Sequence, residues 1–270
     1  MNQAQKKLIW IFAVLVGSAV IPFLLVQRRS SAQPGRGPAS PQARPLMSAA
    51  AAQTHRNVGK AYYEQGKYTE AAAEFEQVVK SGHAVATDYM DLGLAYTQAN
   101  KLNQALAALT TAKQMAPNLI AVDYNLGILY KRELHYGPAE DAFKKVLAAD
   151  PDDPASLFNL GTVYFAERKM DLALQTHERL NNMGFARGQN FYVASLFRTF
   201  TLLVRMGRRA DAQKMLNLHQ EYADRLPSVS LQSPALEKGK YGVIMVPAVA
   251  PVHVAGGAAM RPVTFRDISS

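Results

Sequence analysis

A period of 34 residues constrains the fold of this chain more than any other feature of its sequence. Glycine recurs at this spacing, and four further columns of residues keep the same register. The five columns are Gly59, Gly93, Gly127 and Gly161; Val58, Leu92, Leu126 and Leu160; Tyr62, Tyr96, Tyr130 and Tyr164; Ala71, Ala105, Ala139 and Ala173; and Phe75, Leu109, Phe143 and His177. Self-similarity at such a period is typical of stacked supersecondary units, so we expect a repeat architecture.

Each unit has the pattern of two helices joined by a turn. In the first unit, Val58 and Tyr62 place an apolar stripe on one helix, Gly66-Lys67 breaks that helix, and Phe75 continues the stripe on the next. Glycine in the first helix permits close approach where a side chain would hold two helices apart. We expect the alanine column to do the same from the facing helix.

These residues resemble the tetratricopeptide repeat family, whose pattern is a Leu-Gly pair, a Tyr three residues later, then an Ala, an aromatic residue and a boundary Pro. Residues 125–151, NLGILYKRELHYGPAEDAFKKVLAADP, carry nearly the whole pattern. The resemblance implies an all-α, right-handed solenoid whose four units, residues 53–188 together, lie at about 53–86, 87–120, 121–154 and 155–188. Units one and four are less regular, because His83 and Phe185 replace the boundary Pro and His177 replaces a bulky apolar residue.

Two segments follow the regular units. Residues 189–226 read as a degenerate fifth helix pair, whose first helix, at about residues 190–204, should be about one turn longer than its predecessors. Repeat arrays need atypical terminal units to cover the last apolar face, so this pair is predicted to be a cap. Residues 227–270 form a tail without helical periodicity, and GVIMVPAVAPVHV, from Gly242, has prolines among β-branched residues and should be extended.

The N-terminus carries a candidate membrane anchor. After a leader of residues 1–7, residues 8–26 read LIWIFAVLVGSAVIPFLLV without a charge, which is long enough to span a hydrocarbon core. Residues 27–52 are rich in Pro, Ala and Gly and predict a linker, whose last residues, LMSAAAA, can begin a helix. The alternatives are a signal peptide cleaved after Ser30-Ser31-Ala32 and a buried core helix.

The anchor predicts a single-pass protein of a bacterial-type inner membrane. Basic residues flank it on both sides, with Lys6 and Lys7 before it and Arg28 and Arg29 after it, and counting them slightly favours a cytoplasmic body. A short leader with two lysines nevertheless resembles the start of a bacterial export signal. We therefore expect a periplasmic body, with a cytoplasmic body as the alternative.

Composition excludes several other classes of function. The net charge is +9, but residues 1–53 carry +6 of it and residues 54–188 carry −2, which disfavours a nucleic-acid surface on the repeats.

The sequence also lacks the usual signs of a catalytic or metal site. The chain has no cysteine, no phosphate loop and no nucleophile elbow. The run Asp150-Pro-Asp-Asp153 reads as a helix cap. None of the histidines has metal-site spacing, and we interpret all six as surface or boundary residues: His55, His83, His135, His177, His219 and His253. We expect no catalysis, cofactor or metal.

The candidate binding site is the face of the first helices that lines the concave surface in the resembling family. Its residues are Arg56, Lys60, Tyr63, Met90, Leu94, Tyr124, Ile128, Phe158 and Phe165. This face begins polar and becomes apolar, so it predicts a groove for an apolar helix or extended segment of a protein partner. The alternative is that the fifth helix pair or the chain's own tail fills it.

These features together predict a membrane-anchored scaffold that binds a partner protein, while residues 8–26 contact the lipid bilayer. The alternative is a structural accessory subunit of a larger membrane protein complex, with its anchor and tail buried in the assembly.

Overall fold

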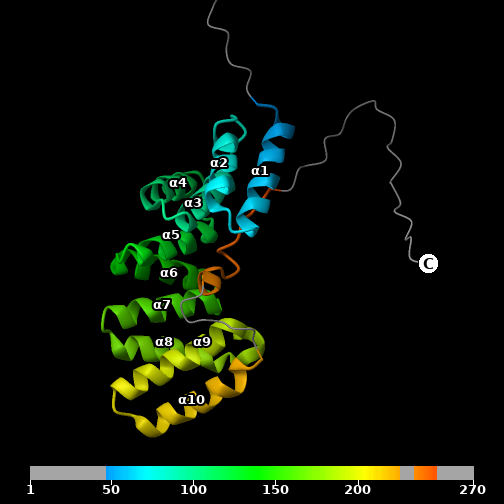
Figure 1. Ribbon diagram of the computed structural model, residues 1–270. Helices are drawn as coiled ribbons and strands as arrows, with labels where there is room; N and C mark the ends of the chain where they lie inside the picture. The colour runs from blue at the N-terminus through cyan, green and yellow to red at the C-terminus, as the bar shows by residue number, and fades with distance from the viewer. Residues whose placement is uncertain (1–46, 226–233, 248–270) are drawn as a thin grey trace, which may run out of the picture. The chain divides into compact units, whose positions relative to one another are not determined.

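The computed structural model describes residues 47–225 and 234–247, and within these ranges the chain is helical with no strand (Figure 1). The α-helices are α1 Ala49–Glu64, α2 Tyr68–Val79, α3 Ala86–Gln98, α4 Leu102–Met115, α5 Ile120–Arg132, α6 Tyr136–Ala149, α7 Pro154–Ala166, α8 Met170–Asn182, α9 Gly184–Arg205 and α10 Arg209–Ala223. A short 3₁₀ helix, η2, spans Pro234–Glu237.

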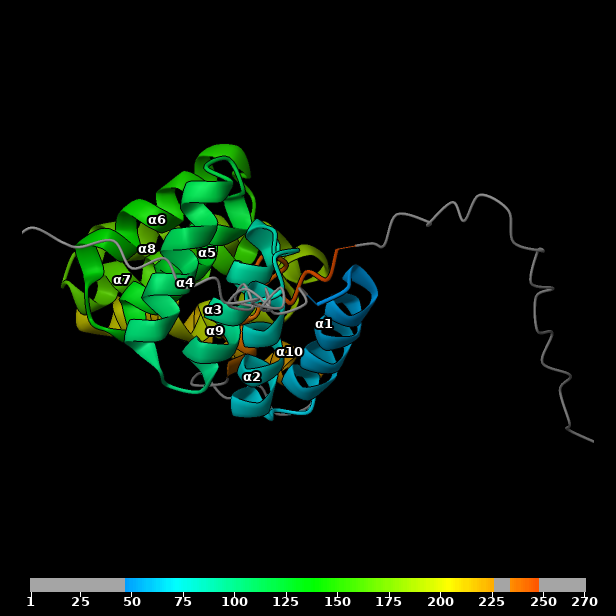
Figure 2. The same cartoon turned by 90° about the horizontal axis from the view of Figure 1, so that it is seen from above.

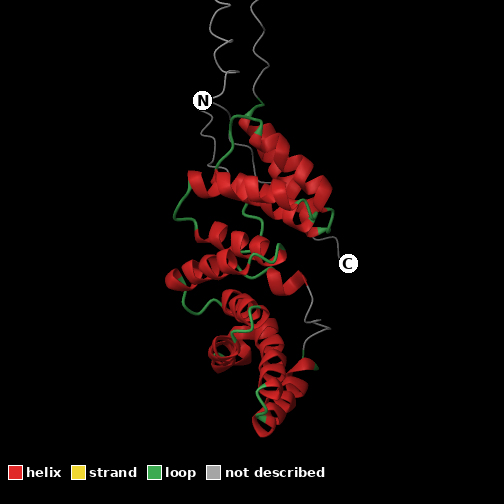
Figure 3. Ribbon diagram, turned by 90° about the vertical axis from the view of Figure 1, so that its left-hand side faces the viewer, coloured by secondary structure: helices red, strands yellow, loops and turns green. Residues whose placement is uncertain are grey.

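The helices form antiparallel pairs that stack in chain order (Figures 1 and 3). Each helix packs against the next one along the chain, and in addition α3 contacts α5, α5 contacts α7 and α7 contacts α9. The first helices of successive pairs therefore share one side of the stack. The predicted all-helical solenoid of repeated helix pairs is confirmed.

The turn inside each regular pair needs one residue with positive φ. Gly66, Asn100, Leu134 and Arg168 hold this position at 34-residue spacing, with φ between 57° and 76°. Glycine adopts such a conformation without steric cost, whereas a β-carbon is disfavoured there. The predicted break at Gly66-Lys67 is thus one case of a turn that the later units make with less suitable residues.

The glycine column marks the closest helix contacts, but the facing residue differs from our expectation. A β-carbon on Gly127 would lie 2.8 Å from Cε1 of Phe143, and one on Gly93 would lie 2.6 Å from Cγ of Leu109. Each glycine therefore accommodates the bulky residue sixteen positions later rather than the alanine. The alanines, including Ala139, are fully buried elsewhere in the same helix pairs.

His177 corrects the interpretation of all histidines as surface or boundary residues. Its ring is completely buried against Gly161 and fills the place that Phe143 fills one unit earlier. Its Nδ1 lies 3.1 Å from Oγ of Ser195. Burial, together with the charge of Arg198, lowers the pKa of His177 to about 3, so the neutral ring packs as a bulky apolar residue would.

The fifth pair differs from the others at its start. Helix α9 spans Gly184–Arg205, but its backbone leaves helical geometry at Gln189 (φ 43°, ψ −120°), so the helix after the kink begins near residue 190, as expected. After this kink the helix continues to Arg205. In α10 only Ala212 is buried, so its outward face is polar, as a cap requires.

The predicted leader, the anchor at residues 8–26 and most of the linker lie outside the described residues. Helix α1 begins at Ala49, within the last part of that linker, where Oγ of Ser48 accepts a hydrogen bond from N of Ala51 (3.1 Å). None of the helices between α1 and α10 is both long and apolar enough to cross a membrane.

A β-carbon at Gly127 should destabilise the array. We expect Gly127→Ala to lower the free energy of unfolding by about 1–3 kcal/mol, because Phe143 is fully buried and has little room to move. Gly137→Ala is the matched control, since nothing lies within 4 Å of its β-carbon position. Urea unfolding followed by circular dichroism measures both, and equal stabilities would contradict the packing described for this column.

Candidate functional site

The candidate site is the side of the stack formed by α1, α3, α5 and α7, and the described part of the chain's own tail lies along it (Figures 1 and 2). We call residues 234–247 the docked segment and the surface that they contact the inner face. Leu236 and Ile244 of the docked segment are buried among residues of the repeats. This finding matches the alternative in which the tail fills the groove, although the contacts also include Leu236, which precedes the stretch from Gly242 that was predicted to be extended.

Three equivalent side chains hold the backbone of the docked segment. Asn159 Nδ2 donates to the carbonyl of Leu236 (3.2 Å), Asn125 Nδ2 donates to the carbonyl of Tyr241 (2.9 Å), and Asp91 Oδ1 accepts from N of Met245 (2.9 Å). We call Asp91, Asn125 and Asn159 the polar ladder. Its contacts show that the docked segment runs from the fourth repeat towards the second, opposite to the order of the repeats.

The polar ladder is held in place by its own helices. Asn125 Nδ2 also donates to the carbonyl of Ala121 (2.7 Å), and Asn159 Nδ2 donates to that of Ala155 (2.9 Å). Both amides are therefore oriented by α5 and α7 in the same way. Such preorganised donors bind an extended backbone without reference to its side chains.

A pair of cations on α5 binds the one acidic residue of the docked segment. Glu237 lies 2.9 Å from Lys131 Nζ and 2.9 Å from Arg132 Nε. Burial opposes ionisation of Glu237, but the two cations outweigh it and hold the pKa of this carboxyl below its usual range. Burial lowers the pKa of Lys131, and Glu237 opposes that shift. The negative charge of Glu237 and the positive charges of Lys131 and Arg132 therefore compensate one another in this partly buried site.

A second polar contact holds the middle of the docked segment. Asp150, at the end of α6, accepts a hydrogen bond from the hydroxyl of Tyr241 (2.8 Å) and forms an ion pair with Lys240. The expected capping role of this acidic run is confirmed at Asp153, which accepts from N of Ser156 (2.8 Å) at the start of α7. Asp150 has a role that we did not predict.

Apolar contacts complete the site at three places. Leu236 packs beside Phe158, the ring of Tyr241 lies 6.2 Å from that of Tyr124, and Ile244 joins the cluster that contains Met90. Leu94 belongs to the cluster that contains Ile244, and Ile128 belongs to the cluster against which Tyr241 packs.

The polar end of the predicted groove lies beside α1. The ammonium of Lys238 lies 5.3 Å from the centre of the Tyr63 ring. Lys60 and Tyr63 line a hollow of about 410 Å³ beside Val243.

Two of the predicted site residues support the repeats as much as the inner face. Tyr124 packs edge-on against Phe143 (5.9 Å between ring centres), and Phe158 packs against His177 (5.7 Å). Both are almost completely buried. Truncating either one would therefore damage the core, so they are unsuitable for testing binding separately from folding.

Arg56 and Phe165, at the two ends of the predicted groove, contact residues of the repeats. The guanidinium of Arg56 is buried in a two-point ion pair with Asp88 (2.7 and 2.8 Å) and also donates to the carbonyl of His83. Phe165 is half-buried, and the guanidinium of Arg205 lies 4.5 Å from the centre of its ring. No contact of either residue with the docked segment is found within the described ranges.

The polar ladder was missing from the predicted site, although the sequence contains a signal for it. A sixth column at 34-residue spacing lies two positions before the glycine column and consists of Asn57, Asp91, Asn125 and Asn159. Asn57 is exposed and bonds Gln53 instead. A polar residue repeated on an otherwise apolar helix face indicates that the same contact recurs from one repeat to the next. Lys131, Arg132 and Asp150 have no such periodic signal.

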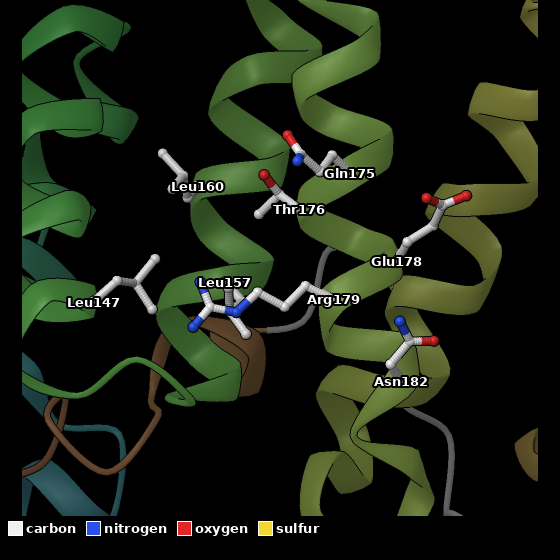
Figure 4. A pocket seen from close by; sticks show the side chains of 8 residues that line it. All are labelled: Leu147, Leu157, Leu160, Gln175, Thr176, Glu178, Arg179 and Asn182. Carbon is white, nitrogen blue, oxygen red and sulfur yellow. The ribbon is translucent and has the colours of Figure 1, made fainter.

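Another hollow, of about 510 Å³, opens between α6, α7 and α8 (Figure 4). Leu147, Leu157 and Leu160 line it together with polar side chains of α8, among them Arg179. Arg179 is already bonded to the carbonyl of Pro151 and lies 3.6 Å from Asp152. Across the described part of the chain, no group of three or more His, Asp or Glu side chains could hold a metal ion.

A family model described as tetratricopeptide repeat matches residues 58–120 and 124–180. The matched residues have the tetratricopeptide repeat pattern. Tetratricopeptide repeat protein 8 of Caenorhabditis elegans is 28% identical over 118 residues, which is 43% of this chain. The match spans only 23% of that relative's length.

The repeats also resemble solved structures of MamA. MamA 41-end from Desulfovibrio magneticus RS-1 has a TM-score of 0.58 at 16% identity, covering 66% of this chain and 98% of that one. MamA MSR-1 has a TM-score of 0.53 at 22% identity, covering 64% and 97%. At these identities the likeness shows the tetratricopeptide fold alone, and fold by itself does not identify a function.

Proposed function

We propose that this chain is a membrane-tethered scaffold whose inner face binds an extended segment of a partner protein. The docked segment is then an intramolecular occupant of the same site. The observation that carries this proposal is the polar ladder, in which three successive repeats present an equivalent side chain to the backbone of one continuous segment. Because backbone groups are common to all sequences, a segment from another chain can make the same bonds.

A photo-crosslinking experiment in native membranes tests the proposal. A photoreactive residue replaces Lys60, which lines the hollow beside Val243, in the full-length chain. The matched control places it at Leu172, an exposed position of α8. We expect adducts with a partner protein from position 60 only, and more of them when Gly239→Val dislodges the docked segment. Equal adducts from both positions would place the partner elsewhere.

The rival proposal, a permanent accessory subunit of a membrane complex, predicts a different pattern. Adducts would then form with the same neighbours whether or not Gly239→Val is present, and the assembly would survive purification in detergent and high salt. The extent of self-docking favours the scaffold, because a tail bound to its own repeats is not free to be buried in a larger assembly.

The proposed tether is the apolar stretch at residues 8–26, with the repeats on the periplasmic side of a bacterial-type inner membrane. Its charge-free length supports a spanning helix. We expect the full-length protein to remain in the membrane fraction after alkaline carbonate washing. Recovery of a shortened chain that begins near Gln33 in the supernatant would instead indicate signal-peptide cleavage and remove the tether from the proposal.

A further inference from the structure

We infer that the partner segment has a defined chemistry: an acidic residue, a glycine two positions later, an aromatic residue four positions later and an aliphatic residue seven positions later. The inference rests on the proposed function and specifies the ligand of that site. The docked segment has this pattern in Glu237, Gly239, Tyr241 and Ile244. Each of the four positions meets a feature of the inner face that other residue types do not fit.

The acidic position is set by charge. With Glu237 in place, the side chains of Lys131 and Arg132 are only 17% and 23% exposed. Lys131 is fixed by a bond to Oδ1 of Asn159 (2.6 Å), and Arg132 by a bond to the carbonyl of Thr97 (2.7 Å). Neither cation can turn towards solvent without breaking these bonds. An occupant without a carboxylate would leave two buried positive charges uncompensated.

A third cation strengthens this demand. Arg198 of α9 is half-buried, and its charge contributes to lowering the pKa of Lys131. Its Nε is buried without a hydrogen-bond partner among the described residues. Arg198 therefore adds to the positive charge around Lys131. Lys131 and Arg132, which contact Glu237 directly, disfavour a neutral or basic residue at the acidic position.

The glycine position is set by space. A β-carbon on Gly239 would lie 2.1 Å from Cβ of Ala155 and 3.3 Å from Oη of Tyr124. Ala155 sits in the first turn of α7 and is itself buried, so its β-carbon cannot move aside. The backbone of the occupant must pass directly over Ala155, which only glycine permits.

The aromatic and aliphatic positions are set by contact partners. Tyr241 combines a ring contact with Tyr124 and a hydroxyl bond to Asp150, and a purely aliphatic residue offers neither. Ile244 is 9% exposed in a cluster of apolar residues from α1, α3 and α5. Val243, which lies between these two positions, is exposed, so the inner face does not restrict the residue type there in the same way. The polar ladder sets the direction of the occupant, and the residues at these four positions set its register.

The intact chain should bind such a segment weakly, because its own copy competes. An attached ligand acts at an effective concentration in the millimolar range, so a free segment must overcome this competition. Gly239→Val in the full-length chain should displace the docked segment, because the new side chain would clash with Ala155. The substitution changes no residue of the repeats. Val243→Ala is the matched control, since it alters an exposed side chain of the same segment.

The test titrates a fluorescent peptide with the sequence of residues 234–247 into full-length protein in detergent and follows fluorescence anisotropy. The Gly239→Val chain should bind this peptide at least about tenfold more tightly than the native and Val243→Ala chains. Peptides that carry Glu237→Lys or Gly239→Val should bind the Gly239→Val chain at least about tenfold more weakly than the native peptide. A peptide with Val243→Ala should bind as the native one does.

Two outcomes would overturn the inference, and they are distinguishable. If native, Glu237→Lys and Gly239→Val peptides all bind with equal affinity, the inner face binds segments without this pattern, and only the proposed function survives. If none of the peptides binds the Gly239→Val chain while its circular dichroism spectrum is native, the inner face is not a site for segments in trans, and the proposed function fails as well.

Discussion

A full-length chain carrying Glu237→Ala should release its docked segment from the inner face. The substitution leaves Lys131 and Arg132 largely buried without their shared carboxylate. Breaking a buried ion pair from one side typically costs about 3–5 kcal/mol. Because detachment lets water solvate both cations, we expect the segment to leave the inner face rather than bear this cost. Hydrogen exchange at N of Met245, which is bonded to Asp91, should accelerate by about a hundredfold or more.

Glu221→Ala is the matched control for this release. Glu221 pairs with Arg225 at 3.4 Å, and both side chains are about half exposed, so its loss should change stability by less than about 1 kcal/mol. Exchange at Met245 should stay as in the native chain. If Glu237→Ala also leaves that exchange rate unchanged, the two cations do not hold the segment, and the acidic position of the inferred ligand would lose its physical basis.

Asp91→Asn should make the protein markedly more stable than the native chain at alkaline pH. Asp91 is 1% exposed, and burial raises its pKa to about 8, although the bond from N of Met245 opposes this shift. Asp88 raises the pKa further, whereas Lys60 and Arg56 lower it. The folded chain thus holds a proton at this site that the unfolded chain loses near its ordinary pKa of 3.8.

The sign of the effect follows from this difference. Between about pH 4 and pH 8 the folded state binds the extra proton, so stability falls as pH rises, by about 1.4 kcal/mol per pH unit. The contribution of Asp91 is fully present below its unfolded pKa and is lost as pH rises through about 8. His177 acts in the opposite direction between its folded pKa of about 3 and its ordinary 6.5, so the net decline should appear above pH 6.5.

Comparison of the two chains isolates Asp91, because every other group titrates in both. Asparagine already occupies the equivalent positions at Asn125 and Asn159, and its amide oxygen can accept the bond from Met245. In urea unfolding, the variant should equal the native chain near pH 4 and exceed it by on the order of 5 kcal/mol at pH 9. Asp141→Asn, on the exposed face of α6, controls for loss of a surface charge. Parallel curves for Asp91→Asn and native chains would show that Asp91 is ionised when buried.

The repeats could be predicted from sequence because their determinants are local. Gly127 and Phe143 lie sixteen residues apart in one helix pair, and the period repeats this relation in the neighbouring units. The kink at Gln189 has no equivalent in the other units, so the 34-residue columns could not predict it. His177 shows a further limit: its column was recognised, but its burial as a neutral ring depends on Gly161 and Ser195 around it.

The candidate site could be predicted only in part. The apolar residues of the inner face, such as Met90 and Tyr124, follow from the helix periodicity, and the tail could be recognised as a segment without a core of its own. The tail was expected to be extended, but Pro234–Glu237 form a 3₁₀ helix. Which tail residue meets which repeat residue could not be derived. Asp91 and Met245 are 154 positions apart, and their bond leaves no periodic trace in the sequence.

The amino-acid sequence by itself determined the helix pairs, their tetratricopeptide pattern and the apolar character of the inner face, because these depend on side chains a few turns apart. Only the tertiary structure decided that residues 234–247 occupy that face and that Glu237 compensates two cations of α5. Stacking brings equivalent positions of successive repeats into one line, and that line becomes a binding site only once the pairs are packed. The polar ladder is therefore visible in the sequence as a periodic column of polar residues, but only the fold turns it into one continuous surface that binds residues 234–247.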